Sequence, residues 1–241
     1  MAKKKDEFRL KRGFVMRFLH WFLKLFRKKI TIVNDSDEEI SNKTIYLSNH
    51  AGANGPMTYE IYFPTRLTPW GAHQMCEGIK SRWNYLYHIF YRQKLHWGKF
   101  KAFVVATLFC PISILVYRGI GLIPTYTDSR FLNTLKKSCR ALDEGSSILI
   151  FPEDSSEGYK NPPEKFYNGF VALCKVCKKR LKESVPVRLS YFFPKLHKIV
   201  VSKSIDVCKM LEDGLSEDAI AEKLTALMQE LYYKHAELPQ N

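Results

Sequence analysis

The stretch that decides the fold is SNHAGANGP, residues 48–56, which follows a short apolar run and leads into a predicted helix. Pro56 suits the first turn of that helix, because its missing N–H would be unpaired there anyway. Asn54 or Gly55 is the expected helix cap. His50 is therefore expected on a strand-to-helix loop at the end of a sheet, where a general base can reach a substrate.

The composition favours an anionic partner. The chain has 38 Lys and Arg against 24 Asp and Glu, a formal net charge of +14, which suits nucleic acid or an anionic membrane. Much of the basic excess lies beside large apolar side chains in the first thirty residues. A surface that follows the phosphates of a nucleic acid does not need so many phenylalanines and leucines, so we expect no nucleic-acid partner. The six scattered cysteines are typical of reduced thiols.

The first thirty residues predict a basic amphipathic helix. Phenylalanine, leucine and tryptophan cover most of it, a pattern typical of a helix that lies in a lipid interface. Charges interrupt it too often for a membrane span. The alternative is a terminal helix docked on the protein's own core. The side chains expected on its basic face are Arg17, His20, Lys24, Arg27 and Lys28.

We therefore expect two parts: a membrane-surface helix over residues 1–30 and an α/β domain over residues 31–241. The expected location is the cytoplasmic face of the cell membrane. Residues 102–117 are almost all apolar but shorter than the roughly 20 residues that cross a bilayer. They predict either a buried core helix or a segment that dips into the membrane.

The rest of the chain alternates predicted strands and helices. This alternation indicates an α/β fold with a mixed, partly parallel sheet flanked by helices. The expected strands are 44–47, 67–75, 119–124, 147–151, 185–193 and, as an edge strand, 199–202. The expected helices are 56–63, 127–142, 164–182 and 216–235.

Four short motifs follow one another in a fixed order and spacing. They are Asn49-His50, Gly121-Leu122-Ile123-Pro124, Phe151-Pro152-Glu153 and Val185-Pro186-Val187. Together they resemble the glycerolipid acyltransferase family, which includes the lysophosphatidic acid acyltransferases, over about residues 43–205. The resemblance implies an O-acyltransferase that moves a fatty acyl chain from acyl-CoA or an acyl-carrier protein to a lysophospholipid or related lipid hydroxyl. It implies no metal and no bound cofactor.

In that family the histidine of the first motif is the general base, and a following aspartate orients its imidazole. The resemblance assigns the base to His50, whereas Gly55 stands at the aspartate position. Glu60, the nearest carboxylate in sequence, and Glu153, expected at the same sheet edge, are the candidate replacements. A backbone carbonyl or Asn54 could orient His50 instead, and Glu153 could simply cap its loop.

The family holds glycerol phosphate with arginines in its second and third motifs, because the planar guanidinium binds phosphate in a bidentate way. Here Ser156 replaces one arginine, while Arg118 and Arg130 lie on either side of the other position. Lys160 could compensate, but the loop is acidic, which favours an acceptor other than a phosphomonoester. The resemblance gives these substrate-binding candidates: Asn49, Asn54, Arg118, Gly121, Ile123, Pro124, Arg130, Phe151, Pro152 and Lys160.

The expected partners are thus an anionic membrane surface, a lysolipid acceptor and a thioester donor. The missing aspartate and arginine also motivate an alternative. In that alternative the chain is a catalytically inactive lipid-binding protein that retains the acyltransferase fold.

Overall fold

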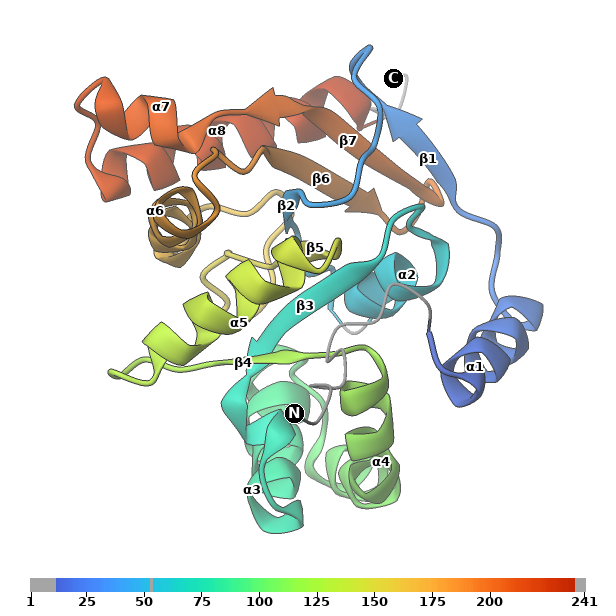
Figure 1. Cartoon of the computed structure of the whole chain (residues 1–241). Helices are drawn as coiled ribbons and strands as arrows, with labels where there is room; N and C mark the ends of the chain where they lie inside the picture. Colours follow the sequence, from blue (N-terminus) through green and yellow to red (C-terminus); the bar gives the residue numbers. More distant parts are fainter. Residues whose placement is uncertain (1–11, 53, 237–241) are drawn as a thin grey trace.

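The chain folds around one seven-stranded sheet with the strand order β1-β7-β6-β2-β5-β3-β4 (Figure 1). The computed structural model describes residues 12–52 and 54–236. Neighbouring strands are parallel except β6 and β7. This confirms the predicted mixed α/β class. The strands are β1 (Thr31–Asn34), β2 (Ile45–Ser48), β3 (Leu67–Ala72), β4 (Ile123–Thr125), β5 (Ser147–Ile150), β6 (Val187–Phe193) and β7 (Lys198–Ile205).

Strand β2 lies at the centre of the sheet, parallel to both of its neighbours. Ile45 is paired with Ile148 of β5 on one side and with Val187 of β6 on the other. The loops that follow β2 and β5 leave the same edge of the sheet, because both strands run in the same direction. Ligands of open parallel sheets bind outside this carboxyl edge.

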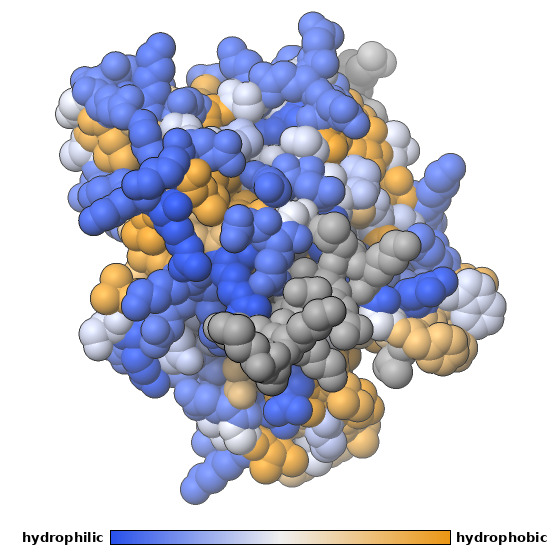
Figure 2. Space-filling model, viewed as in Figure 1, coloured by the Kyte–Doolittle hydropathy of each residue, from blue (hydrophilic) through white to orange (hydrophobic). Residues whose placement is uncertain are grey.

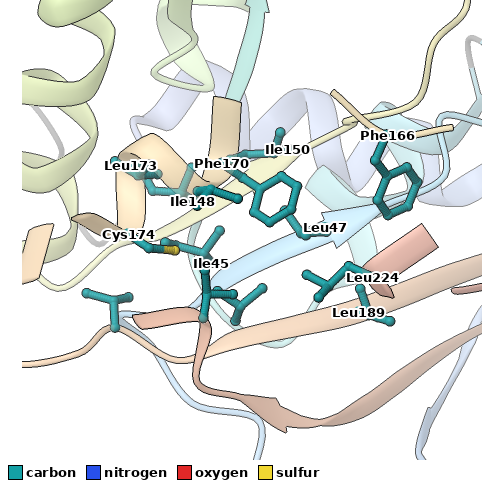
Figure 3. Packing of buried hydrophobic residues seen from close by; sticks show 14 of the residues in the cluster. Ile45, Leu47, Ile148, Ile150, Phe166, Phe170, Leu173, Cys174, Leu189 and Leu224 are labelled. Carbon is teal, nitrogen blue, oxygen red and sulfur yellow. The ribbon is translucent and has the colours of Figure 1, made fainter. Parts of the chain in front are cut away.

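The two faces of the sheet carry separate hydrophobic cores, because side chains alternate along each strand. Ile45 and Leu47 of β2 point to the face that α5 (Phe131–Asp143), α6 (Gly169–Leu181) and α8 (Glu217–His235) cover. Figure 3 shows this core around Phe170 and Leu224. The opposite face packs Tyr46 of β2 against Tyr59 of α2 (Asn54–Tyr62). The short α7 (Val207–Glu212) precedes α8.

A helical lobe is inserted between β3 and β4 and lies away from the sheet, beside the labels α3 and α4 in Figure 1. It contains a 3-10 turn η1 (His73–Cys76), α3 (Ile79–Asn84), the π-helix η2 (Tyr85–Lys94) and α4 (Lys99–Gly119). Its small core joins η2 to α4. Leu86, Tyr91, Ala102, Ala106 and Cys110 are the buried residues of that core.

Helix α4 is the one helix in the described residues that is long and apolar enough to cross a membrane. Only a narrow strip of it is buried, and its other apolar side chains are half-buried or exposed, with Phe100 at 83% and Leu108 at 69%. The alternative of a buried core helix over residues 102–117 is therefore wrong.

Helix α1 (Phe14–Leu25) forms the described part of the predicted amphipathic segment, and the lysine run before it lies outside the described residues. Two basic side chains of the segment contact α2. His20 Nε2 lies 3.0 Å from Glu60 Oε1, and Arg27 donates a hydrogen bond of 3.3 Å to Thr58 Oγ1. The helix thus docks on the protein, through His20 and the buried Met16, while Arg17 and Lys24 of the predicted basic face are exposed.

Three further expectations need correction. Residues 199–202 are not an edge strand: β7 is covered on its outer side by β1, which pairs Ile32 with Ile199. The helix expected from residue 164 begins only at Gly169, because Phe166 bridges to Glu153 across the preceding loop. The cysteines are not all reduced, since Cys139 and Cys177 form a disulfide between α5 and α6.

Candidate active site

The imidazole of His50 is oriented by a backbone carbonyl. The chain turns sharply after His50, with positive φ at Ala51 (46°) and Gly52 (64°). This turn places the Gly52 carbonyl oxygen 2.6 Å from His50 Nδ1. A carbonyl only accepts, so Nδ1 carries the proton and Nε2 keeps a free lone pair. One of the alternatives left open by the sequence, a backbone carbonyl in place of the aspartate, is thus the arrangement found.

Aromatic rings hold the half-buried imidazole in place. Tyr159 stacks on His50 with 4.4 Å between ring centroids and 16° between planes, and Phe151 packs at 4.7 Å. The Tyr159 hydroxyl is 3.5 Å from Nε2, and the stack places it over the ring face, so it is a weak partner at most. Burial, reinforced by the charge of Lys94, lowers the pKa of His50 to about 3. The imidazole is therefore neutral near pH 7 and able to accept a proton.

Glu153 contacts His50 through the main chain. Its Oε1 accepts a hydrogen bond of 2.6 Å from the His50 backbone N–H. Burial raises the pKa of Glu153 to about 7, and this hydrogen bond and Lys94 oppose the rise. Glu153 thus anchors the His50 loop, contrary to the expectation that it orients the imidazole, but it remains an ionisable group next to the base.

Gly55 allows α2 to begin directly against the His50 backbone. A Cβ at this position would lie 2.0 Å from the carbonyl oxygen of His50 and 2.9 Å from its carbonyl carbon. Helix α2 is fixed in this place by buried hydroxyls: Ser48 donates a 2.7 Å hydrogen bond to Tyr59, whose oxygen is 2.8 Å from Ser190 Oγ. An aspartate at position 55 therefore does not fit this backbone.

Glu60 belongs to a different cluster. Its carboxylate forms ion pairs with Arg12 and His20, which come from the N-terminal segment. Arg12 also donates hydrogen bonds to the carbonyl oxygens of Leu67 and Ile120. Glu60 thus joins α2 to the N-terminal segment and does not orient His50, contrary to the expectation from sequence proximity.

The two asparagines of the motif have structural contacts. Asn49 is buried and pairs with the backbone of Phe192: its Oδ1 accepts from the N–H at 2.8 Å and its Nδ2 donates to the carbonyl at 3.0 Å. Asn54 is exposed at the start of α2 and accepts a 3.4 Å hydrogen bond from Arg27. Asn49 therefore ties the end of β2 to β6, and the hydrogen bonds of the two amides go to Phe192, Ser48 and Arg27 and not to His50.

The second motif also supports the fold. Ile123 and Pro124 are buried in β4, where Ile123 is paired with Trp70 of β3. Gly121 has φ 70° in the turn that leads from α4 into β4. The Pro124 carbonyl accepts a 2.7 Å hydrogen bond from Thr134. These residues are therefore placed in the sheet and its turn, and not beside His50.

The cationic candidates are exposed or already paired. Arg118 is exposed in the last turn of α4. Arg130 pairs with Asp128 at 2.7 Å, and Lys160 pairs with Glu164 at 2.5 Å. None of the three is placed at the imidazole, so the expected phosphate contacts are not assembled from these side chains.

The sequence predicted no role for two residues that lie at the site, Tyr159 and Lys94. Lys94 Nζ donates a 2.8 Å hydrogen bond to Ser155 Oγ and lies 5.7 Å from the centroid of the Tyr159 ring. The sequence signal was weak: one lysine at the end of a segment rich in Tyr, Trp and His.

The third motif lies beside His50, at the sheet edge where its position in the sequence placed it. Phe151 reaches His50, and the buried Pro152 accepts a 2.8 Å hydrogen bond from the Tyr167 N–H. Within residues 12–52 and 54–236, no group of three or more His, Cys, Asp or Glu side chains is placed to hold a metal ion.

Among solved structures, the chain is similar to the crystal structure of the 1-acyl-sn-glycerophosphate (LPA) acyltransferase PlsC from Thermotoga maritima. The sequence identity is 13%, the TM-score is 0.45, and the match covers 94% of this chain and 81% of that chain. No protein-family model matches the chain, and no curated protein matches it.

Restoring the aspartate of the motif at position 55 should destabilise the fold and should not raise the activity. In Gly55→Asp the new Cβ collides with the His50 carbonyl, so the first turn of α2 has to move and the His50 loop with it. We expect a loss of roughly 1–3 kcal/mol in the free energy of unfolding, measured by urea denaturation, and no gain in acyl transfer. Gly78→Asp is the matched control, because a Cβ there meets nothing within 4 Å and the residue also precedes a helix. A Gly55→Asp protein of unchanged stability and higher activity would contradict this account.

Proposed function

We propose that this protein is a membrane-associated O-acyltransferase. It transfers a fatty acyl chain from a thioester, acyl-CoA or an acyl-carrier protein, to the hydroxyl of a lysophospholipid or related lipid, with His50 as the general base. The observation that carries the proposal is the neutral imidazole whose Nδ1 is held by Gly52 while Nε2 stays free.

The chemistry needs one base and an activated acyl donor. Nε2 takes the proton of the acceptor hydroxyl as its oxygen attacks the thioester carbonyl carbon. The C–O bond forms, the tetrahedral intermediate collapses, and the C–S bond breaks. The leaving thiolate takes the proton back from the imidazolium. The thioester is already activated, so this sequence calls for no metal or bound cofactor.

A carbonyl performs one of the two tasks of the missing aspartate. It fixes the tautomer and the ring orientation. In serine proteases, loss of the correct tautomer lowers kcat by about 10⁴-fold. It does not supply a negative charge to stabilise the imidazolium. The nearest carboxylate is Glu153, at the His50 backbone. We therefore assign the second task to ionised Glu153.

Two helices with exposed apolar side chains support membrane attachment. Figure 2 shows hydrophobic residues at the lower end of the molecule, where α4 lies, and at the right over α1. A basic protein with such surfaces suits an anionic leaflet, and stable attachment takes more than one signal. The exposed apolar residues are Phe14, Phe18, Trp21, Phe22 and Leu25 on α1, and Phe100, Phe103, Leu108, Ile112 and Leu115 on α4.

The first test is acyl transfer in mixed micelles with a panel of lysolipids and both donor types. We expect His50→Ala to lower kcat/KM by about 10²–10⁴-fold, because the general base is lost. His88→Ala is the control, since His88 is exposed in the helical lobe. Wild-type protein that binds lipid vesicles but transfers no acyl chain with any pair would replace this proposal with the lipid-binding alternative.

The activity should depend on pH through Glu153. Its pKa of about 7 means that the carboxylate ionises as the pH rises through neutrality. We expect kcat/KM to rise over that interval, because the new negative charge stabilises the imidazolium. In Glu153→Gln this rise should disappear and the activity at pH 8 should fall.

Stability gives a second readout for the same group. The pKa of Glu153 is higher in the folded chain than its usual 4.5. The stability that its protonation contributes is therefore fully present below pH 4.5 and is lost as the pH rises through about 7. Wild type should therefore lose stability relative to Glu153→Gln between pH 5 and pH 8, in urea denaturation. A constant difference across this range would contradict the raised pKa.

Vesicle binding should depend on the apolar face of α1. In Phe18→Ser/Trp21→Ser two exposed aromatic side chains are lost, each worth about 1.5–3 kcal/mol when fully buried. We expect at least about a tenfold weaker partition onto phosphatidylglycerol vesicles, measured by co-sedimentation. Tyr233→Ser on α8 removes an equally exposed aromatic ring and should bind like wild type. Equal binding by all three proteins would exclude α1 as a membrane contact.

A further inference from the structure

One cation stands beside the candidate base without belonging to any of the four motifs. Lys94 ends the π-helix η2, and its Nζ lies 2.8 Å from Ser155 Oγ. The same ammonium lies 5.7 Å from the centroid of the Tyr159 ring, which stacks on His50 at 4.4 Å. The ammonium and the imidazole therefore both lie next to the ring of Tyr159.

This charge is poorly compensated. Lys94 is half-buried and makes no ion pair within the described part of the chain. The acids that face it are Glu153, whose carboxylate accepts the His50 N–H, and Asp154, whose carboxylate accepts the Ser156 N–H. One hydroxyl satisfies one of its three donors. A partly desolvated ammonium with unused donors is stabilised when an anion binds to it.

An acceptor whose hydroxyl reaches His50 Nε2 also comes close to Tyr159 and Lys94. The Tyr159 hydroxyl lies 3.5 Å from Nε2. Tyr159 is also the ring over which the Lys94 ammonium lies. In a glycerophospholipid with one free hydroxyl at the central carbon, the phosphate sits on the neighbouring carbon. A hydroxyl at Nε2 thus carries its phosphate toward Lys94.

We propose that Lys94 binds the phosphodiester of the acceptor and selects lysophospholipids over neutral monoacylglycerols. A single ammonium matches the single negative charge of a phosphodiester, while Asp154 and the exposed Glu157 in the same loop oppose the second charge of a phosphomonoester. This inference rests on the proposed acyl transfer and names the class of its acceptor.

The test compares steady-state kinetics with lysophosphatidylglycerol, lysophosphatidate and monoacylglycerol as acceptors. Lys94→Gln should raise KM for lysophosphatidylglycerol by about 10–100-fold, because a charge-assisted contact is lost, and should raise the KM for monoacylglycerol far less. Any effect of the lost charge on His50 and Glu153 should be the same for both acceptors. Lys94→Arg keeps the charge and should retain most of the affinity. Lys160→Gln is the matched control, since Lys160 follows the same loop but is exposed and paired with Glu164.

Two outcomes would overturn the inference. A fall in kcat/KM that is equal for all three acceptors would show that Lys94 acts on the chemistry and does not distinguish the head groups. Unchanged KM values for the phosphate-bearing acceptors in Lys94→Gln would show that the ammonium contacts no acceptor phosphate.

A binding measurement separates this inference from the acyl transfer itself. His50→Ala protein, which should not turn over, is titrated with monomeric lysophosphatidylglycerol, with and without the additional Lys94→Gln change. Tighter binding to the protein that retains Lys94 supports the inference even if wild type transfers no acyl chain. Equal binding by both proteins contradicts it, whatever the activity of wild type.

Discussion

The site depends on the contact between the first turn of α2 and the backbone of His50. This contact is so close that only glycine fits at position 55, where a Cβ would lie 2.0 Å from the His50 carbonyl oxygen. To let α2 begin there, the chain turns back at once through Ala51 and Gly52, both with positive φ. That turn brings the Gly52 carbonyl to His50 Nδ1. The packing that excludes a carboxylate therefore also supplies the group that orients the imidazole.

Replacing a carboxylate by a carbonyl separates two functions that one residue usually combines. Gly52 orients the ring as a dipole, without adding charge, and burial then keeps His50 neutral by lowering its pKa. Charge enters the site from two other directions. Glu153 brings a carboxylate whose pKa is about 7, and Lys94 brings an ammonium from the helical lobe. The electrostatic state of His50 thus depends on groups that are far from it in sequence.

Much of the sheet, and the neighbourhood of His50 and Glu153, could be predicted because it follows from local patterns. The apolar runs of β2 and β5 and their parallel pairing place both following loops at one edge. Contacts between distant segments could not be predicted. Lys94 reaches the site only because the lobe folds back, and Glu60 meets partners from the N-terminal segment. Likewise, β7 becomes an interior strand because the four-residue strand β1 is added beside it.

Helix α1 has the opposite orientation to a helix of a soluble domain. His20 and the following Arg27 contact α2, Met16 is buried, and the aromatic side chains of α1 are turned outward. Exposing these aromatic side chains is unfavourable in water and favourable when lipid covers them. Helix α1 contacts both α4 and α2, and the first turn of α2 also packs on His50 at Gly55. Helix α2 therefore links the segment with the exposed aromatic side chains to the loop that carries His50.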